Sequence, residues 1–246
     1  MAGKRRRRRG IYLLPNLFTT GCLLCGFYAI TASMQGEFEK AVVALFFAMV
    51  MDGLDGRVAR LTQTESAFGA EYDSLSDMVA FGMAPALMVY LWSLSELKNL
   101  GWFVSFFYAA ATALRLARFN TQIGIQDRRY FQGLPSPASA AVVASFVWLG
   151  EEGLLPGWIG QPLIALLALS IALLMVSNFR YYSFKEIDIG RRIPFFWATL
   201  LALLAALLLT HPPSMLFLLF FGYALSGPVL TLWFLHKRRR GRRLAR

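Results

Sequence analysis

The stretch that decides the fold runs from residue 52 to residue 77 and reads DGLDGRVARLTQTESAFGAEYDSLSD. It places Asp52 and Asp55 at the end of one apolar stretch, and Asp73 and Asp77 at the start of the next. Four carboxylates at a membrane surface repel one another and are costly to desolvate unless positive charge lies between them. The stretch therefore predicts a cation site built into a membrane protein.

The rest of the chain has the composition of a membrane protein. Of its 246 residues, 57% are hydrophobic, and they fall in long blocks. A helix needs about 20 apolar residues to cross a bilayer, and its backbone groups must be satisfied within the segment. We therefore predict an all-α, polytopic membrane helix bundle of eight transmembrane helices, at residues 12–34, 39–62, 68–93, 97–119, 136–150, 157–178, 193–211 and 214–235. The fifth is short for a span, which leaves open a start within the preceding loop.

The basic residues are unevenly distributed between the two sets of helix ends. With these spans, all Lys and Arg residues except Lys40 and Lys98 lie on one side. The opposite loops are acidic and contain Glu37, Glu39, Glu96, Glu151 and Glu152. This is the positive-inside pattern, which puts both termini and the four aspartates on the cytoplasmic side and favours an even number of spans.

The net charge of +11 comes largely from two basic tails, at residues 1–11 and 236–246. We interpret the tails as anchors on an anionic leaflet, where each charge is worth about 1 kcal/mol. RNA binding is the alternative, but neither tail interleaves aromatic residues with the charges, so we expect no nucleic-acid partner. A cleaved signal peptide is disfavoured because seven more apolar segments follow the first. The chain is predicted to be one membrane domain over residues 1–246, with the bundle at 12–235.

The spacing of the four aspartates favours a shared site. Asp52 and Asp55 are three residues apart, and Asp73 and Asp77 are four apart, so each pair lies on one helix face. A short connection makes the two helices antiparallel, and the carboxylate faces can then meet. Oxygen ligands suit Mg²⁺, Mn²⁺ or Ca²⁺, and paired metals are the standard device for an in-line displacement at phosphorus. Ordinary helix-end charges are the alternative, but Asp52 and Asp55 directly follow the apolar run 42–51.

Small residues and one cation accompany the aspartates. Gly56 and Gly69 remove side chains where a ligand or a facing helix must come close, and Ala59 does nearly the same. Arg60 lies on the loop side, where a guanidinium can hold a phosphate. The stretch thus combines cation ligands with room for a phosphorylated substrate.

The pattern D-x-x-D-G-x-x-A-R, then eight residues, then G-x-x-x-D-x-x-x-D resembles the signature of the CDP-alcohol phosphotransferase family at every defined position. The resemblance implies a core of six transmembrane helices, often in a homodimer. It also implies transfer of a phosphatidyl or similar group from a CDP-linked donor to an alcohol, with release of CMP.

The resemblance also implies roles for individual residues. Two divalent cations, Mg²⁺ or Mn²⁺, would be bound by Asp52, Asp55, Asp73 and Asp77, and Asp77 would also be the general base. Asp77 lies one turn beyond Asp73, so it can reach both a metal and the acceptor alcohol. The CDP-lipid pocket would include the first three aspartates together with Pro15, Asn16, Thr19, Gly56, Ala59, Arg60 and Gly69.

Two further segments bear on the acceptor alcohol. The segment from Arg115 to Asn120, with residues 131–137, and the segment 177–185 resemble the bacterial membrane-integrated phosphatidylserine synthases of this family. That resemblance implies CDP-diacylglycerol and L-serine as substrates and a place in the bacterial inner membrane. Cationic and amide side chains that could hold the acceptor or a phosphate are Arg115, Arg118, Asn120, Arg180 and Lys185.

Two alternatives stay open. Glycerol 3-phosphate or inositol could be the acceptor in the same family, because a phosphorylated acceptor would also need cationic residues. A divalent-cation transporter could use the same aspartates, but transporter sites usually lie near the bilayer midplane, whereas these carboxylates are predicted near one surface.

Overall fold

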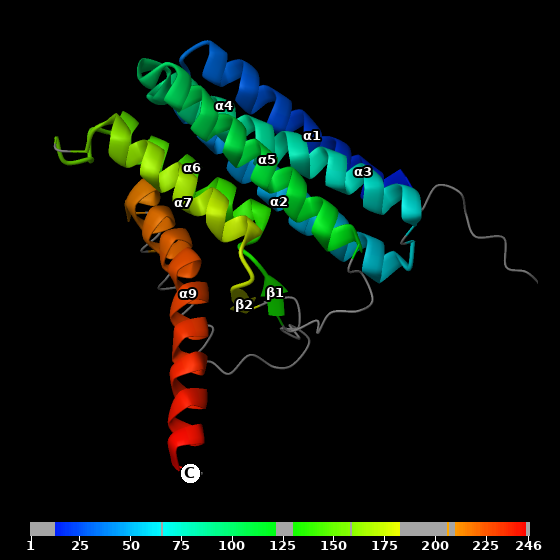
Figure 1. Ribbon diagram of the computed structural model, residues 1–246. Helices are drawn as coiled ribbons and strands as arrows, with labels where there is room; N and C mark the ends of the chain where they lie inside the picture. Colours follow the sequence, from blue (N-terminus) through cyan, green and yellow to red (C-terminus); the bar gives the residue numbers. More distant parts are fainter. Residues whose placement is uncertain are drawn as a thin grey trace, which may run out of the picture.

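The computed structural model describes residues 13–64, 66–121, 130–157, 159–182, 206 and 210–244, and this part of the chain is mostly helical (Figure 1). The α-helices are α1 (Leu13–Met34), α2 (Phe38–Thr62), α3 (Ala67–Asp77), α4 (Ala84–Trp92), α5 (Asn99–Thr121), α6 (Ser136–Glu151), α7 (Gln161–Val176) and α9 (Pro212–Leu244). A π-helix, η2 (Met78–Met83), joins α3 to α4, and a 3₁₀ helix, η3 (Leu94–Leu97), precedes α5. The predicted helix bundle is confirmed.

The helices follow the predicted spans closely where they are described. α3, η2 and α4 together cover the third span, and α6 begins at Ser136, as the sequence predicts for the short fifth span. Among the described residues, four helical segments are long and apolar enough to cross a membrane, namely Leu14–Met34, Ala67–Trp92, Asn99–Thr121 and Pro212–Thr231. α2 is also long, but its second half carries charged residues. The predicted span 193–211 lies almost wholly outside the described residues, so the count of eight stays a prediction.

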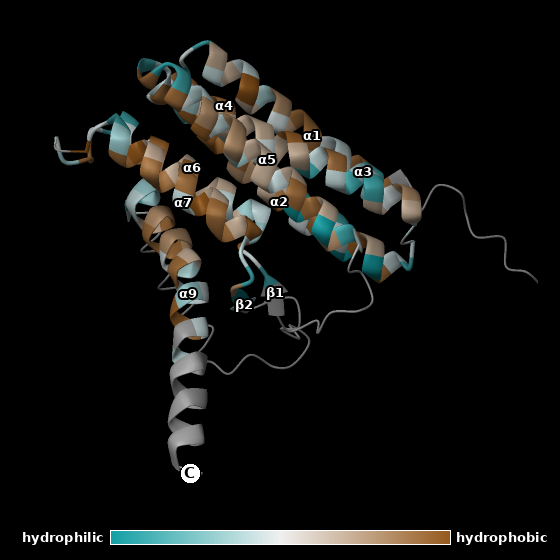
Figure 2. Ribbon diagram, viewed as in Figure 1, coloured by the Kyte–Doolittle hydropathy of each residue, from teal (hydrophilic) through white to brown (hydrophobic). Residues whose placement is uncertain are grey.

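The first five α-helices run alongside one another, and α9 crosses them at an angle and extends beyond the bundle (Figure 1). α1 packs against both α2 and α3, while α6 packs against α2 and α9. Apolar residues cover much of the bundle, and hydrophilic residues gather where α2 ends and α3 begins (Figure 2). α9 continues as a helix to Leu244, so the basic C-terminal segment from residue 236 prolongs the last helix.

Small residues allow close packing of α1 on the helix that carries the third span. A Cβ atom added at Gly26 of α1 would lie 2.7 Å from Cα of Ala80 in η2. Without a hydrophobic driving force in lipid, helices associate through such close backbone approach. This contact fixes η2, which begins directly after Asp77, against α1.

The π-helix interrupts the third span next to the predicted site. Pro85, near the start of α4, has no N–H and cannot donate to the carbonyl of Phe81. The Tyr108 hydroxyl of α5 lies 3.5 Å from that carbonyl oxygen and donates to it. Proline and a local π-turn are recognised causes of helix irregularity, so the sequence position of Pro85 explains the break.

A two-stranded antiparallel sheet joins the loops on one side of the bundle. β1 (Tyr130–Gln132) pairs with β2 (Arg180–Tyr182), with Phe131 opposite Tyr181. The Tyr181 hydroxyl donates to the carbonyl of Ala224 in α9 at 2.9 Å. A Cβ at Gly227 would come within 2.3 Å of the Tyr181 ring, so only glycine allows this contact. The sheet therefore links the loops to α9.

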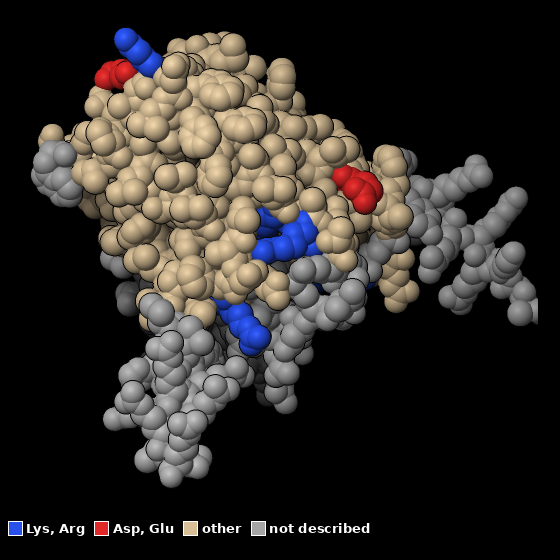
Figure 3. All heavy atoms as spheres, viewed as in Figure 1, with Lys and Arg blue, Asp and Glu red and all other residues tan. Residues whose placement is uncertain are grey.

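Most of the Lys and Arg atoms visible in Figure 3 lie in the lower half of the face shown, toward the side where β1 and β2 lie in Figure 1. This arrangement gathers basic side chains near the loops that were predicted to be basic. The placement of that side toward the cytoplasm stays a prediction.

Candidate active site

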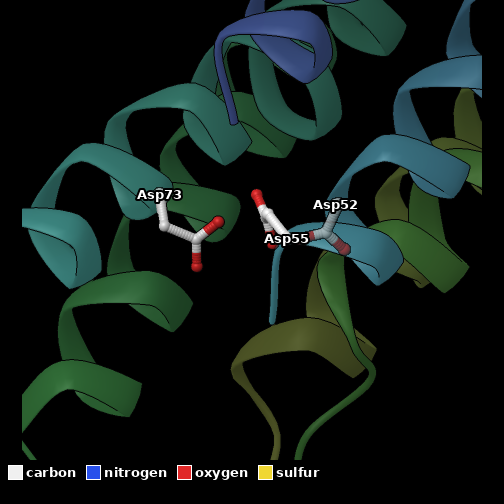
Figure 4. A group of neighbouring side chains, drawn as sticks. All are labelled: Asp52, Asp55 and Asp73. Carbon is white, nitrogen blue, oxygen red and sulfur yellow. The ribbon is translucent and has the colours of Figure 1, made fainter. Parts of the chain in front are cut away.

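Three of the four aspartates come together between α2 and α3. Asp52, Asp55 and Asp73 each offer a carboxylate oxygen, and these oxygens lie within 4.8 Å of one another. Figure 4 shows Asp52 and Asp55 on one helix facing Asp73 on another across a small gap. Asp55 is buried, and the other two are half-buried. We call these three residues the aspartate cluster.

The turn between the two helices explains how the cluster forms. α2 ends at Thr62, and Gln63 follows in the left-handed conformation with φ 53°. α3 begins after Ser66, whose side-chain oxygen accepts from the backbone N–H of Gly69 at 3.0 Å. This N-cap satisfies one of the free donors of the first turn. The chain therefore reverses within a few residues, and the prediction that the carboxylate faces meet is confirmed for the aspartate cluster.

α1 ties the two sides of the site together. The Thr19 hydroxyl donates to Oδ2 of Asp55 at 2.9 Å, and the Thr19 carbonyl accepts from the Ser76 hydroxyl at 3.0 Å. At the next residue of α1, the hydroxyls of Thr20 and Tyr72 of α3 are hydrogen-bonded at 2.9 Å. Thr19 was predicted as a nucleotide contact, and the structure places its hydroxyl on a carboxylate of the cluster.

Asp77 lies outside the aspartate cluster, one helical turn along from Asp73. Its side chain is 9% exposed, and its Oδ1 has no hydrogen-bond partner. The charged groups close enough to act on it include Asp52, Asp73 and Arg115. The structure therefore separates one buried carboxylate from the three that meet.

The residues present fit divalent cations. Three carboxylates in so small a volume repel one another unless cations lie between them, and hard oxygen donors are the ligands that Mg²⁺ and Mn²⁺ prefer. Because Asp55 is buried and held by Thr19, one ligand of the site is oriented before any ion binds.

The two glycines of the motif have different surroundings. A Cβ at Gly69 would lie 3.1 Å from Oγ of Ser66 and 3.7 Å from Oδ1 of Asn16, so Gly69 leaves room at the start of α1. A Cβ at Gly56 would meet nothing within 4 Å. The prediction that a facing helix comes close to Gly56 is therefore wrong, whereas the space beside Gly56 is open to a ligand.

Three more of the residues predicted for the CDP-lipid pocket lie on α1 and α2. Arg60 is exposed, and its Nε donates to the carbonyl of Gly56 at 2.9 Å. The two terminal nitrogens of the guanidinium take no part in that bond. Ala59 is half-buried on the same helix, and Pro15 is buried at the start of α1. The structure places all three near the ends of α1 and α2.

The residues predicted for the acceptor are divided between several environments. Arg115 is buried, and its Nη1 donates to Oγ of Ser136 at 2.9 Å. Asn120 donates through Nδ2 to Oγ of Ser74 at 3.0 Å, beside the aspartate cluster. Arg180 is exposed on β2, and Lys185 lies outside the described residues.

Arg118 makes a different set of contacts. Its Nη2 donates to the carbonyls of Gln132 (2.8 Å) and Ser177 (3.2 Å), and its Nη1 donates to the carbonyl of Val176 (3.1 Å). Nη1 also lies 3.3 Å from Oδ1 of Asn178. The guanidinium thus holds the end of α7 and the last residue of β1 against α5.

The sequence of residues 12–177 matches the CDP-alcohol phosphatidyltransferase family, and this match includes the whole aspartate motif. The chain belongs to this family. Three relatives illustrate its place there. It is 39% identical over 178 residues to a CDP-diacylglycerol–serine O-phosphatidyltransferase of Helicobacter pylori, covering 72% of this chain and 75% of the relative. The protein of the same name from Mycobacterium tuberculosis is 35% identical over 219 residues, covering 83% and 73%. An archaetidylserine synthase of Methanothermobacter thermautotrophicus is 31% identical over 170 residues, covering 68% and 69%.

Sequence reasoning did not assign three serines that support this family's site. Ser74 and Ser76 lie between Asp73 and Asp77 and bond to Asn120 and to the Thr19 carbonyl. Ser136 begins a mostly apolar helix and bonds to Arg115. In the sequence these serines stand out only as polar residues near the end of an apolar span, and this position does not show which residue each hydroxyl bonds to.

Proposed function

We propose that this chain is a phosphatidylserine synthase, which transfers the phosphatidyl group of CDP-diacylglycerol to the hydroxyl of L-serine and releases CMP. The observation that carries the proposal is the aspartate cluster, with buried Asp77 one turn away, in a member of the CDP-alcohol phosphatidyltransferase family. The acceptor is supported by the names of the relatives from Helicobacter pylori and Mycobacterium tuberculosis.

The residues of the site suggest a direct displacement. Two divalent cations, held by Asp52, Asp55, Asp73 and Asp77, would supply charge neutralisation of the pyrophosphate and of the departing CMP oxygen. The Asp77 carboxylate accepts the proton of the serine hydroxyl as that oxygen attacks the phosphorus attached to diacylglycerol. The bond from this phosphorus to the bridging oxygen breaks, and its electron pair leaves with CMP. No side chain needs to form a covalent intermediate.

The surroundings of the cluster suggest how the donor is held. The open space beside Gly56 and the room left by Gly69 near Asn16 would take the nucleotide part of the donor. Arg60 would reach its phosphates, because only its Nε is bonded to the helix backbone. Positioning and electrostatics then provide most of the rate enhancement.

We further propose that the site faces the cytoplasm from a bacterial inner membrane, with both termini on the same side. The basic loops and tails support this orientation through the positive-inside rule. Serine and CMP are water-soluble, so such a site could exchange them directly with the cytoplasm. A homodimer, which the family resemblance implies, and the eight-span topology, which the apolar blocks predict, are part of the proposal.

An acceptor panel tests the proposal. Purified full-length protein is mixed with CDP-diacylglycerol and Mn²⁺ or Mg²⁺, and CMP release is measured with L-serine, glycerol 3-phosphate or inositol. We expect release to require both the divalent ion and L-serine, with phosphatidylserine as the lipid product. Release with another acceptor alone would move the chain to a different activity of the same family. Metal flux into proteoliposomes without CDP-lipid, and no CMP release, would favour a transporter.

A further inference from the structure

A buried arginine and a buried aspartate lie near each other without forming an ion pair. Arg115 of α5 and Asp77 at the end of α3 are each 9% exposed. Each contributes to the electrostatic environment of the other. No ion pair within 4.0 Å joins these two described residues, and both Nε of Arg115 and Oδ1 of Asp77 have no hydrogen-bond partner. One hydrogen-bond donor, Nε of Arg115, and one acceptor, Oδ1 of Asp77, are therefore buried without a partner.

This arrangement is costly unless something else fills it. Buried charges are normally paired, and burying a polar atom without a partner is destabilising. Two opposite charges that could approach each other would recover much of that cost. The unpartnered Nε of Arg115 indicates a position for a ligand that accepts a hydrogen bond there, while the carboxylate of Asp77 can serve both a cation and a donor on that ligand.

Ser136 adds a second donor on the arginine side. Its hydroxyl oxygen accepts from Nη1 of Arg115 at 2.9 Å, and its side chain is fully buried. Because the oxygen acts as acceptor in that bond, the hydroxyl hydrogen of Ser136 remains available. An oxyanion placed beside Arg115 could therefore receive hydrogen bonds from Nε–H of Arg115 and from the Ser136 hydroxyl.

We propose that Arg115 and Ser136 bind the carboxylate of the acceptor amino acid while Asp77 receives the hydrogen of its hydroxyl. This inference rests on the proposed function and assigns the acceptor's recognition site. L-serine carries both of the required groups, since two carbon atoms link its carboxylate to its hydroxyl oxygen. Arg118, whose guanidinium holds backbone carbonyls, is a positioning residue in this arrangement.

Ser136→Ala tests the assignment in the full-length protein. Steady-state CMP release is measured against L-serine and against CDP-diacylglycerol separately. Loss of a hydrogen bond to a charged group should raise the KM for serine by about tenfold, with the KM for CDP-diacylglycerol unchanged. Arg115→Lys, which keeps the charge but loses the planar donor group, should raise the serine KM further. Ser145→Ala is the matched control, because Ser145 is buried in the same helix and donates to the carbonyl of Ala141.

Ethanolamine provides the readout that a general structural defect would not give. It has the hydroxyl and the ammonium group of serine but no carboxylate, so its inhibition constant against serine should be the same in wild type and Ser136→Ala. An unchanged serine KM in Ser136→Ala would overturn the inference. So would a parallel loss of ethanolamine binding, or a rise in the KM for CDP-diacylglycerol, which would place Arg115 on a donor phosphate. Wild-type protein that releases no CMP with serine would instead overturn the proposed function.

Discussion

The hydroxyl of Thr19 in α1 donates a hydrogen bond of 2.9 Å to Oδ2 of Asp55 in α2. Both side chains are buried, and Asp55 belongs to the aspartate cluster. A helix outside the metal-binding motif therefore orients one of its carboxylates. Such outer partners fix ligand geometry and influence metal affinity.

Thr19→Val should weaken activation by divalent ions, because it keeps the shape of the side chain and removes the hydrogen bond. We expect the Mn²⁺ concentration for half-maximal CMP release to rise by about tenfold to 100-fold, with much of the activity recovered at saturating Mn²⁺. Thr31→Val is the control, because its hydroxyl bonds only within α1. An unchanged Mn²⁺ requirement in Thr19→Val would show that this bond does not influence the site.

Asp77→Asn should abolish most of the activity without preventing donor binding. The amide cannot accept the serine proton, and general-base catalysis typically contributes about 100-fold to 10,000-fold. The measurement is CMP release at saturating serine, together with binding of CDP-diacylglycerol. Full activity in Asp77→Asn would contradict the role of Asp77 as the base.

Arg118→Lys should destabilise the fold more than it changes the chemistry. The guanidinium joins α5 to three backbone carbonyls, two at the end of α7 and one at the last residue of β1, and a lysine ammonium cannot match that planar set of donors. We expect a loss of about 1–3 kcal/mol, read as a lower unfolding temperature in detergent. If stability is unchanged while the serine KM rises, Arg118 contacts the acceptor, as the sequence alone predicts.

Gly26→Ala should disturb the packing that holds η2 in place. The added Cβ would lie 2.7 Å from Cα of Ala80, and backbone atoms cannot move aside as a flexible side chain can. Overpacking of this kind costs about 1–3 kcal/mol. Gly53→Ala is a matched control, because a Cβ there meets nothing within 4 Å. Equal unfolding temperatures for the two variants would contradict the importance of the Gly26 contact.

The sequence predicts the helices well because the apolar blocks have the length that a bilayer demands. It also predicts that the carboxylates of Asp52, Asp55 and Asp73 meet, since helical spacing and a short turn leave little alternative. It does not predict how far Asp77 lies from them. Spacing places a residue on a face, but its depth depends on neighbouring helices such as α1 and α5, which are distant in sequence.

The same limit explains the contacts of Arg115 and Arg118. The sequence offers both guanidiniums as candidates to hold the acceptor or a phosphate. In the structure Arg115 turns to Ser136, and Arg118 turns to carbonyls near residues 132 and 176. Pairing between β1 and β2, which are separated by two helices, creates those carbonyl positions, and no local pattern encodes it.

The central claim is that the aspartate cluster binds divalent cations, and direct Mn²⁺ binding tests it most simply. Electron paramagnetic resonance measures free Mn²⁺ as the full-length protein is titrated, with and without CDP-diacylglycerol. We predict saturable binding of Mn²⁺ that is weakened strongly by Asp55→Asn and by Asp73→Asn. Glu71 is exposed and lies on the same helix as Asp73, so the Glu71→Gln variant should bind Mn²⁺ as the wild type does. Mn²⁺ binding that is absent from the wild type, or that is equal in all four proteins, would contradict the account.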